Sequence, residues 1–128
     1  MEYVLDLNAL LAYLIATHPK HGAVVGRLSK ATRIIVPDLV IVELQWVVLS
    51  RRYPEVDEEV LKETVEAIKT DPSMRLEAVT AEIAGEHMKW YKKLSFFDAY
   101  YAAFSVVHKR KLLTTDRDFE PYDFAEVV

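Results

Sequence analysis

The 128-residue sequence predicts a single α/β domain with a mainly parallel central sheet of four to five short strands and helices on both faces. Short apolar runs alternate with longer stretches in which apolar residues recur at helical spacing. Strands separated by helices need crossover connections, which are right-handed and make the strands parallel. Hydrophobic residues form 52% of the chain, enough for one core, so residues 1–128 are expected to form one domain.

Five short runs predict the strands, at residues 3–6, 33–37, 75–79, 111–116 and 125–128. Helical patterns lie between them, at residues 9–15, 21–30, 39–52, 57–69, 80–93 and 96–110. Two helix starts carry a signal of their own. Asp38 is the expected N-cap of the third helix, and Ser95 with Asp98 has the spacing of a capping box.

The aromatic residues of the helices are assigned to the core, namely Trp46, Trp90, Tyr91, Tyr100, Tyr101 and Phe104. For Trp46, Trp90 and Tyr91 the alternative is a position that faces a partner. None of the four histidines is assigned to a metal, because two flank a proline in a loop and two lie on amphipathic helices.

Charge and composition exclude several classes of protein. The net charge of −4 argues against a protein that coats nucleic acid through a large positive field. Without cysteine the chain has no disulfide and no thiolate metal site, and no apolar run is long enough for a membrane helix. We expect a cytoplasmic protein, and the single asparagine and single glutamine are typical of a thermophile.

Four carboxylates occupy related places in the predicted fold. Asp6 and Asp116 each end a strand, and the ends of parallel strands lie at one edge of a sheet, where ligands bind. Asp98 lies in the first turn of a helix, and Glu43 lies on an apolar helix face, where a charge needs a partner. If the four converge they repel one another, and a divalent cation removes that repulsion. Oxygen ligands alone favour Mg²⁺ or Mn²⁺.

The stretches around these acids are similar to the motifs of the PIN-domain family, in particular of its VapC-type toxin ribonucleases. They are Val4-Leu5-Asp6-Leu7-Asn8, Val42-Glu43-Leu44, Ser95-Phe96-Phe97-Asp98-Ala99 and Leu113-Thr114-Thr115-Asp116-Arg117-Asp118-Phe119. The resemblance covers essentially the whole chain in the family's order, and it implies a three-layer α/β/α PIN-like fold.

The resemblance also implies an activity and a set of site residues. Asp6, Glu43, Asp98 and Asp116 would hold one or two ions that activate water to cleave an RNA phosphodiester, and Asp118 would be an outer or second-metal residue. Asn8, Thr115 and Arg117 are expected to support the site or contact the substrate. Many members have threonine or serine where this chain has Asn8, which can still hydrogen-bond a carboxylate or metal-bound water. The implied partners are RNA and a cognate antitoxin.

Each acid also has a purely structural interpretation. Asp98 can belong to the capping box, Asp116 and Asp118 can begin turns, and Glu43 can be an exposed helix residue or pair with an arginine. Two helices, 39–49 and 96–107, are apolar over more than one face, which predicts a homodimer.

Three other functions compete with a nuclease. A PIN-like domain that no longer cleaves would serve as an RNA-binding or interaction module. A phosphatase of the aspartyl-phosphate type needs a second aspartate where Asn8 stands. A nucleotide-binding enzyme is disfavoured because no glycine-rich phosphate loop is present.

Overall fold

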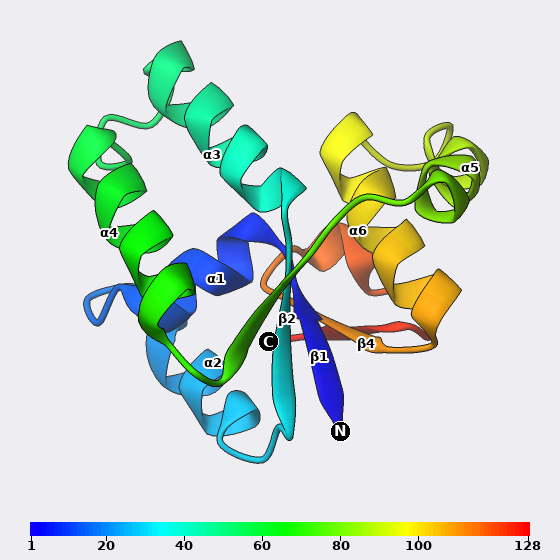
Figure 1. Ribbon diagram of the computed structural model, residues 1–128, viewed down its shortest axis with the longest axis horizontal. Helices are drawn as coiled ribbons and strands as arrows, with labels where there is room; N and C mark the ends of the chain where they lie inside the picture. Colours follow the sequence, from blue (N-terminus) through cyan, green and yellow to red (C-terminus); the bar gives the residue numbers. More distant parts are fainter.

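Five parallel strands form the centre of the computed structural model, which describes residues 1–128 (Figure 1). The strands lie in the order β3-β2-β1-β4-β5. Their bounds are β1 Glu2–Leu5, β2 Arg33–Pro37, β3 Met74–Glu77, β4 Lys111–Thr114 and β5 Ala125–Val127. All four pairings are parallel, as the alternation of strands and helices predicts.

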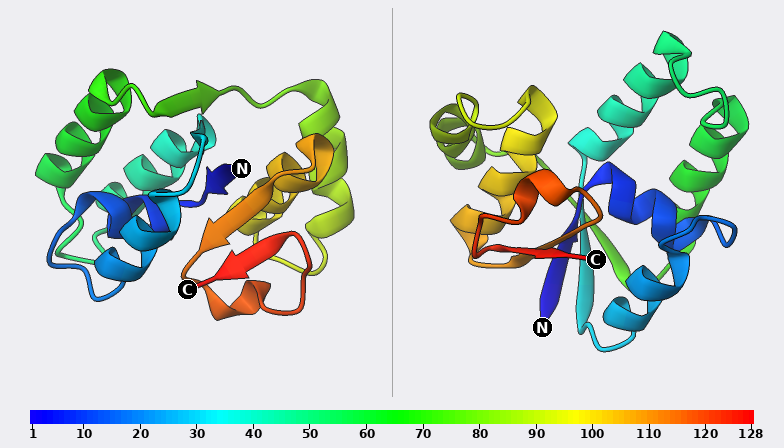
Figure 2. Two further views of the ribbon diagram at one scale, coloured as in Figure 1. Left: turned by 90° about the horizontal axis from the view of Figure 1, so that it is seen from below. Right: turned by 180° about the vertical axis from the view of Figure 1, so that it is seen from behind.

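Helices cover both faces of this sheet and make the three-layer α/β/α fold. They are α1 Leu7–Leu14, α2 His21–Leu28, α3 Leu39–Ser50, α4 Glu58–Thr70, α5 Ala81–Trp90 and α6 Phe96–His108, with a 3₁₀ turn, η1, at Arg117–Phe119. Figures 1 and 2 show α1 to α4 on one face and α5 with α6 on the other. Right-handed crossovers require this, because the chain crosses the sheet in one direction from β1 to β3 and then returns to β4. No helix has the length and apolar character of a membrane span.

The reversal of direction places a crevice beside the first strand. The connection after β1 leads to β2 on one side, whereas β4 lies on the other side of β1. Parallel α/β sheets bind their ligands where the strand order reverses, outside the carboxyl ends of the strands. Here that place lies beyond Leu5, the end of β1, and Thr114, the end of β4. Asp6 and Asp116 come just after these strand ends.

The core is built on the three central strands, which helices bury on both sides. Val4, Leu5, Ile35, Leu112 and Leu113 have no exposed surface, as expected of strands covered on both faces. Tyr101 and Phe104 of α6 join this core, as predicted.

Two aromatic residues assigned to the core are exposed instead. Trp46 keeps 50% of its surface and Tyr91 keeps 52%. The α3 helix is apolar around its circumference, and its buried side is formed by Leu39, Val40, Leu44 and Val47, so Trp46 remains outside. Tyr91 follows the last residue of α5 at the margin of the helical layer. Trp90 is half-buried and packs edge-on against Tyr122 and Phe124.

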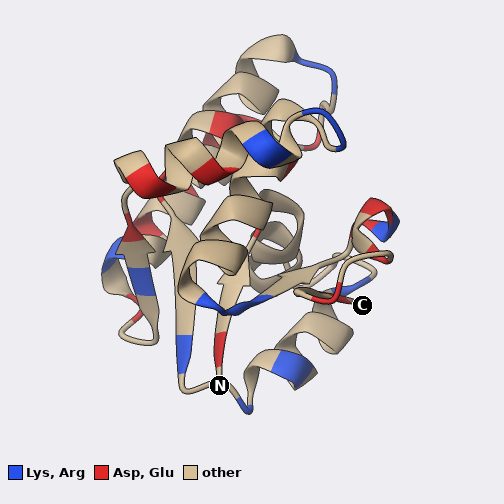
Figure 3. Cartoon of the chain, turned by 90° about the vertical axis from the view of Figure 1, so that its right-hand side faces the viewer, with Lys and Arg blue, Asp and Glu red and all other residues tan.

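The start of α3 and the end of α6 differ from the prediction. Asp38 makes no capping bond, and its Oδ1 accepts a hydrogen bond from the Val79 N–H at 3.3 Å instead. The α6 helix ends at His108, because Lys109 follows it in the left-handed conformation. Arg110, beyond the helix, binds Glu77 at 2.7 Å and Glu2 at 2.9 Å. On the face shown in Figure 3, basic residues are scattered among acidic ones and form no continuous basic surface.

Candidate functional site

Asp6 lies at the bottom of the crevice and both of its oxygens have partners. It follows β1 directly and is the N-cap of α1, where Oδ1 accepts a hydrogen bond from the Ala9 N–H at 2.9 Å. Oδ2 accepts a bond from the Thr114 hydroxyl at 2.5 Å. Only 2% of Asp6 is exposed. The acid that ends the first strand therefore has the partners a buried carboxylate needs, one local and one from β4.

Thr114 joins two of the predicted site residues. Its hydroxyl donates to Asp6 and accepts a hydrogen bond from the Asp116 N–H at 3.0 Å. Asp116 in turn caps η1, with Oδ1 accepting from the Asp118 N–H at 2.9 Å. The sequence interpretation placed Thr115 at the site, yet Thr114 makes these contacts. Thr114 is the buried last residue of β4, whereas Thr115 lies after the strand and makes no side-chain hydrogen bond.

Glu43 is held by a residue that sequence reasoning assigned only to the core. The hydroxyl of Tyr101 donates a 2.5 Å hydrogen bond to Glu43 Oε1, joining α6 to α3. Tyr101 itself is 1% exposed. Its position three residues after Asp98 was an available signal, because residues at i and i+3 share one side of a helix.

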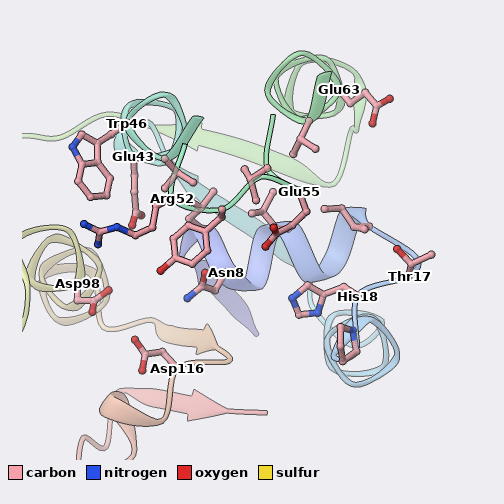
Figure 4. Close-up of a pocket in the computed structure, with 18 of the residues that line it drawn as sticks. Asn8, Thr17, His18, Glu43, Trp46, Arg52, Glu55, Glu63, Asp98 and Asp116 are labelled. Atoms are coloured by element: carbon pink, nitrogen blue, oxygen red, sulfur yellow. The ribbon is translucent and has the colours of Figure 1, made fainter. Parts of the chain in front are cut away.

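Asp98 lies in the first turn of α6, and Ser95 caps that helix. The Ser95 hydroxyl accepts a hydrogen bond from the Asp98 N–H at 3.4 Å, so the predicted cap is present. The cap uses the backbone N–H of Asp98, and the Asp98 side chain lines the cavity described below. Figure 4 shows Asp98 opposite Glu43, with Asp116 next to it.

Burial and mutual repulsion raise the pKa values of three of these acids. Burial is the main cause for Asp6, whose pKa is raised to about 7 despite the bonds from Thr114 and Ala9; the Asp98 and Glu43 charges raise it further. Burial also raises the pKa of Asp98 to about 6, with Asp116 and Asp118 adding to the shift. The pKa of Glu43 is raised by burial and by Asp98, and is lowered by the bond from Tyr101. No basic side chain is among the main influences on these acids.

The acids border one cavity of about 760 Å³. Glu43, Asp98 and Asp116 line it together with Asn8 and Arg52 (Figure 4). Asp6 is buried and does not line the cavity, but it is close enough to feel the charges of Asp98 and Glu43. Besides Asp6, three predicted residues do not line it: Thr115, Arg117 and Asp118. The Arg117 side chain is exposed and its Nε donates to Glu120 at 2.8 Å.

The donor set fits a divalent cation, although the acids do not form a closed set of ligands. No three aspartate, glutamate or histidine side chains lie close enough together to hold one ion directly. Burial is the main cause of the raised pKa values of Asp6 and Asp98, and the charges of neighbouring carboxylates add to it. Oxygen donors from four separate elements around one water-accessible cavity suit a hard ion that keeps some of its waters, such as Mg²⁺ or Mn²⁺.

Several solved structures are similar to this chain, whereas no curated protein matches it. VapC20 of Mycobacterium tuberculosis, described as a toxin that cleaves the sarcin–ricin loop, has a similar structure with a TM-score of 0.67 and 23% identity, over 95% of this chain and 92% of that one. VapBC2 of Rickettsia felis, solved with a fragment of its promoter DNA, has a TM-score of 0.69 and 15% identity, over 100% of this chain and 98% of that one. A toxin–antitoxin complex from Klebsiella pneumoniae has a TM-score of 0.67 and 14% identity, over 98% of this chain and 96% of that one.

These structural similarities concern the fold, which agrees with the topology and the crevice described above. The sequence profile of the PIN domain matches residues 3–125, nearly the whole chain and all four acids at the crevice. The chain therefore belongs to the PIN-domain family.

Proposed function

We propose that this chain is a metal-dependent endoribonuclease that cleaves RNA phosphodiester bonds as the toxin of a VapBC-type toxin–antitoxin pair. One observation carries the proposal: Asp6, Glu43, Asp98 and Asp116, each from a different part of the fold, meet at the crevice where the strand order reverses. Membership of the PIN family and the fold shared with VapC toxins support it.

In this proposal the four acids hold Mg²⁺ or Mn²⁺, with Asp118 at the edge of the site. A bound ion of this kind lowers the pKa of its water and stabilises the charge that develops on phosphate oxygens. The chain's own groups place the acids. Thr114 fixes Asp6, Tyr101 fixes Glu43, and the start of α6 aims Asp98 into the cavity. Asn8 lines the same cavity and provides an amide that can bond a carboxylate or a water.

Titration of the metal-free protein with Mn²⁺ tests the site without requiring the natural RNA. Calorimetry should show saturable binding that Asp6→Asn and Asp98→Asn both lose. Glu63→Gln is the matched control, because Glu63 lines the far end of the cavity and should bind Mn²⁺ as the wild type does (Figure 4). Circular dichroism checks that all four proteins remain folded. If neither variant changes the binding, the acids do not form the metal site.

Cleavage is tested on total cellular RNA with added Mg²⁺ or Mn²⁺, followed by sequencing of the new 5′ ends. We expect a small number of sites that vanish in the Asp98→Asn variant. Metal binding without any cleavage would favour the second candidate, a catalytically silent module that binds RNA or protein.

The proposed partner is an antitoxin, because two of the similar structures are complexes of a toxin with its antitoxin. The purified complex should cleave RNA more slowly than the free chain, and undiminished cleavage by the complex would refute an inhibitory antitoxin. We also propose a homodimer. Val42, Leu49 and Phe96 are more than half exposed on α3 and α6, and self-association would bury such a surface. Sedimentation equilibrium of the free chain measures its mass.

A further inference from the structure

The charges around the cavity are strongly unbalanced. Five carboxylates line it, namely Glu43, Glu55, Glu63, Asp98 and Asp116, while Arg52 is the one lysine or arginine that does. A polyanion such as RNA is repelled by this lining unless cations compensate it. A metal ion compensates the acids at the reacting phosphate, but the neighbouring phosphates need positive charge from the protein.

Arg52 is the one arginine that both lines the cavity and has no carboxylate partner. Five of the seven arginines in the chain form ion pairs with glutamates: Arg27, Arg33, Arg75, Arg110 and Arg117. The two that do not are Arg51 and Arg52, and only Arg52 lines the cavity. Its guanidinium therefore keeps its full hydrogen-bonding capacity for a ligand.

The position of Arg52 is set by Trp46. The guanidinium carbon lies 5.8 Å from the centre of the Trp46 ring, within the range of a cation–π interaction. Both residues belong to the C-terminal part of α3 and the turn that follows it. Figure 4 shows the Arg52 side chain at the acid end of the cavity, with Trp46 on one side and Asp98 on the other. The indole thus holds the cation near the acids without an ion pair that would neutralise it.

We propose that Arg52, held against Trp46, binds a phosphate of single-stranded RNA next to the acid cluster. A guanidinium presents paired N–H donors that match two phosphate oxygens. The half-exposed indole of Trp46 offers a stacking surface for an unpaired base of the same strand. This inference rests on the proposed function, since it takes RNA as the substrate. It moves the expected phosphate contact from Arg117, which is paired with Glu120, to Arg52.

Three matched substitutions test the assignment: Arg52→Gln, Arg51→Gln and Arg117→Gln. Each removes one positive charge, so the net charge of the variants is the same and only the position differs. Binding of an unstructured RNA oligonucleotide with a phosphorothioate backbone, which resists cleavage, is followed by fluorescence anisotropy in Mn²⁺ from roughly 50 to 200 mM salt.

We expect Arg52→Gln to weaken binding about tenfold at the lowest salt and to reduce the slope of log K against log salt by roughly 0.7, the value for one phosphate of a single strand. Arg51→Gln and Arg117→Gln should leave the slope unchanged. Equal slopes for all three variants, or a change in Arg117→Gln alone, overturn the assignment, as does a wild type that fails to bind this RNA.

A Mn²⁺ titration of the same preparations without RNA separates this proposal from the proposed function. Arg52→Gln should bind Mn²⁺ at least as tightly as the wild type, because a nearby positive charge has been removed. Intact Mn²⁺ binding with an unchanged RNA slope rejects only the role of Arg52. If the wild type binds no Mn²⁺ but Arg52→Gln still reduces the salt slope of RNA binding, the RNA contact is supported and the proposed nuclease is rejected.

Discussion

The phenol of Tyr101 on α6 and the carboxylate of Glu43 on α3 are joined by a 2.5 Å hydrogen bond, although 58 residues separate them in the sequence. The two helices lie on opposite faces of the sheet, and this bond links them at the crevice (Figure 1). Burial raises the pKa of Glu43, and the Tyr101 hydroxyl opposes that rise. Tyr101 is therefore a positioning residue that also helps to keep Glu43 ionised.

Replacement of Tyr101 by phenylalanine removes this bond with little change of shape. We expect Mn²⁺ binding at neutral pH to weaken several-fold and the free energy of unfolding to fall by about 1 kcal/mol, because a buried carboxylate loses its donor. Calorimetry and urea denaturation measure the two effects. Tyr100→Phe is the matched control, since no hydrogen bond involves the Tyr100 hydroxyl; equal effects of the two substitutions would exclude the positioning role.

Thr114 should matter far more than its neighbour Thr115. Thr114→Val leaves one oxygen of Asp6 and the Asp116 N–H without their partner, which should lower the free energy of unfolding by about 2 kcal/mol. Thr115→Val breaks no recorded side-chain bond and should change it by less than about 0.5 kcal/mol. Thr114→Ser should restore most of the stability, because the hydroxyl is regained. If Thr115→Val lowers the free energy of unfolding more than Thr114→Val does, Thr114 is not the threonine that supports the site.

The stability of the metal-free protein should fall as the pH rises through neutrality. Burial raises the pKa of Asp6 to about 7 in the folded state, whereas an aspartate in the unfolded chain has its ordinary pKa of 3.8. A raised folded-state pKa gives stability that is complete below the unfolded pKa and is lost as the pH rises through the folded one. Asp98, with a pKa of about 6, acts in the same direction.

Thermal denaturation at pH 5 and pH 8 in the presence of a chelator measures this loss. The melting temperature should be lower at pH 8, and Asp6→Asn should reduce the difference. An amide keeps the shape of the side chain and can still accept the capping bond from Ala9. If the wild type and Asp6→Asn show the same dependence on pH, other groups determine it.

Metal binding should release protons at slightly acidic pH. A metal ion binds the ionised carboxylates, so Asp6 and Asp98 must lose their protons where they are still protonated. At pH 6 the heat of Mn²⁺ binding should therefore vary with the ionisation enthalpy of the buffer, and the affinity should be lower than at pH 8. Heats that do not depend on the buffer at pH 6 would show that the acids are already ionised in the metal-free protein.

The sequence by itself determined the parallel sheet and the helices between its strands, and it placed Asp6 and Asp116 at one edge of that sheet. Hydrophobic periodicity identifies strands and helices locally, and Asp6 and Asp116 meet because parallel strands end at one edge. Ser95 as the cap of α6 was also predictable, because an N-cap involves residues only three apart.

Only the tertiary structure decided which groups donate hydrogen bonds to those acids. The bond between Thr114 and Asp6 spans 108 residues, and Tyr101 meets Glu43 only when α6 and α3 are packed on the sheet. Periodicity shows which side of a helix is apolar but does not show which element covers it. For that reason the exposure of Trp46 and the position of Arg52 in the cavity were not predicted from the sequence.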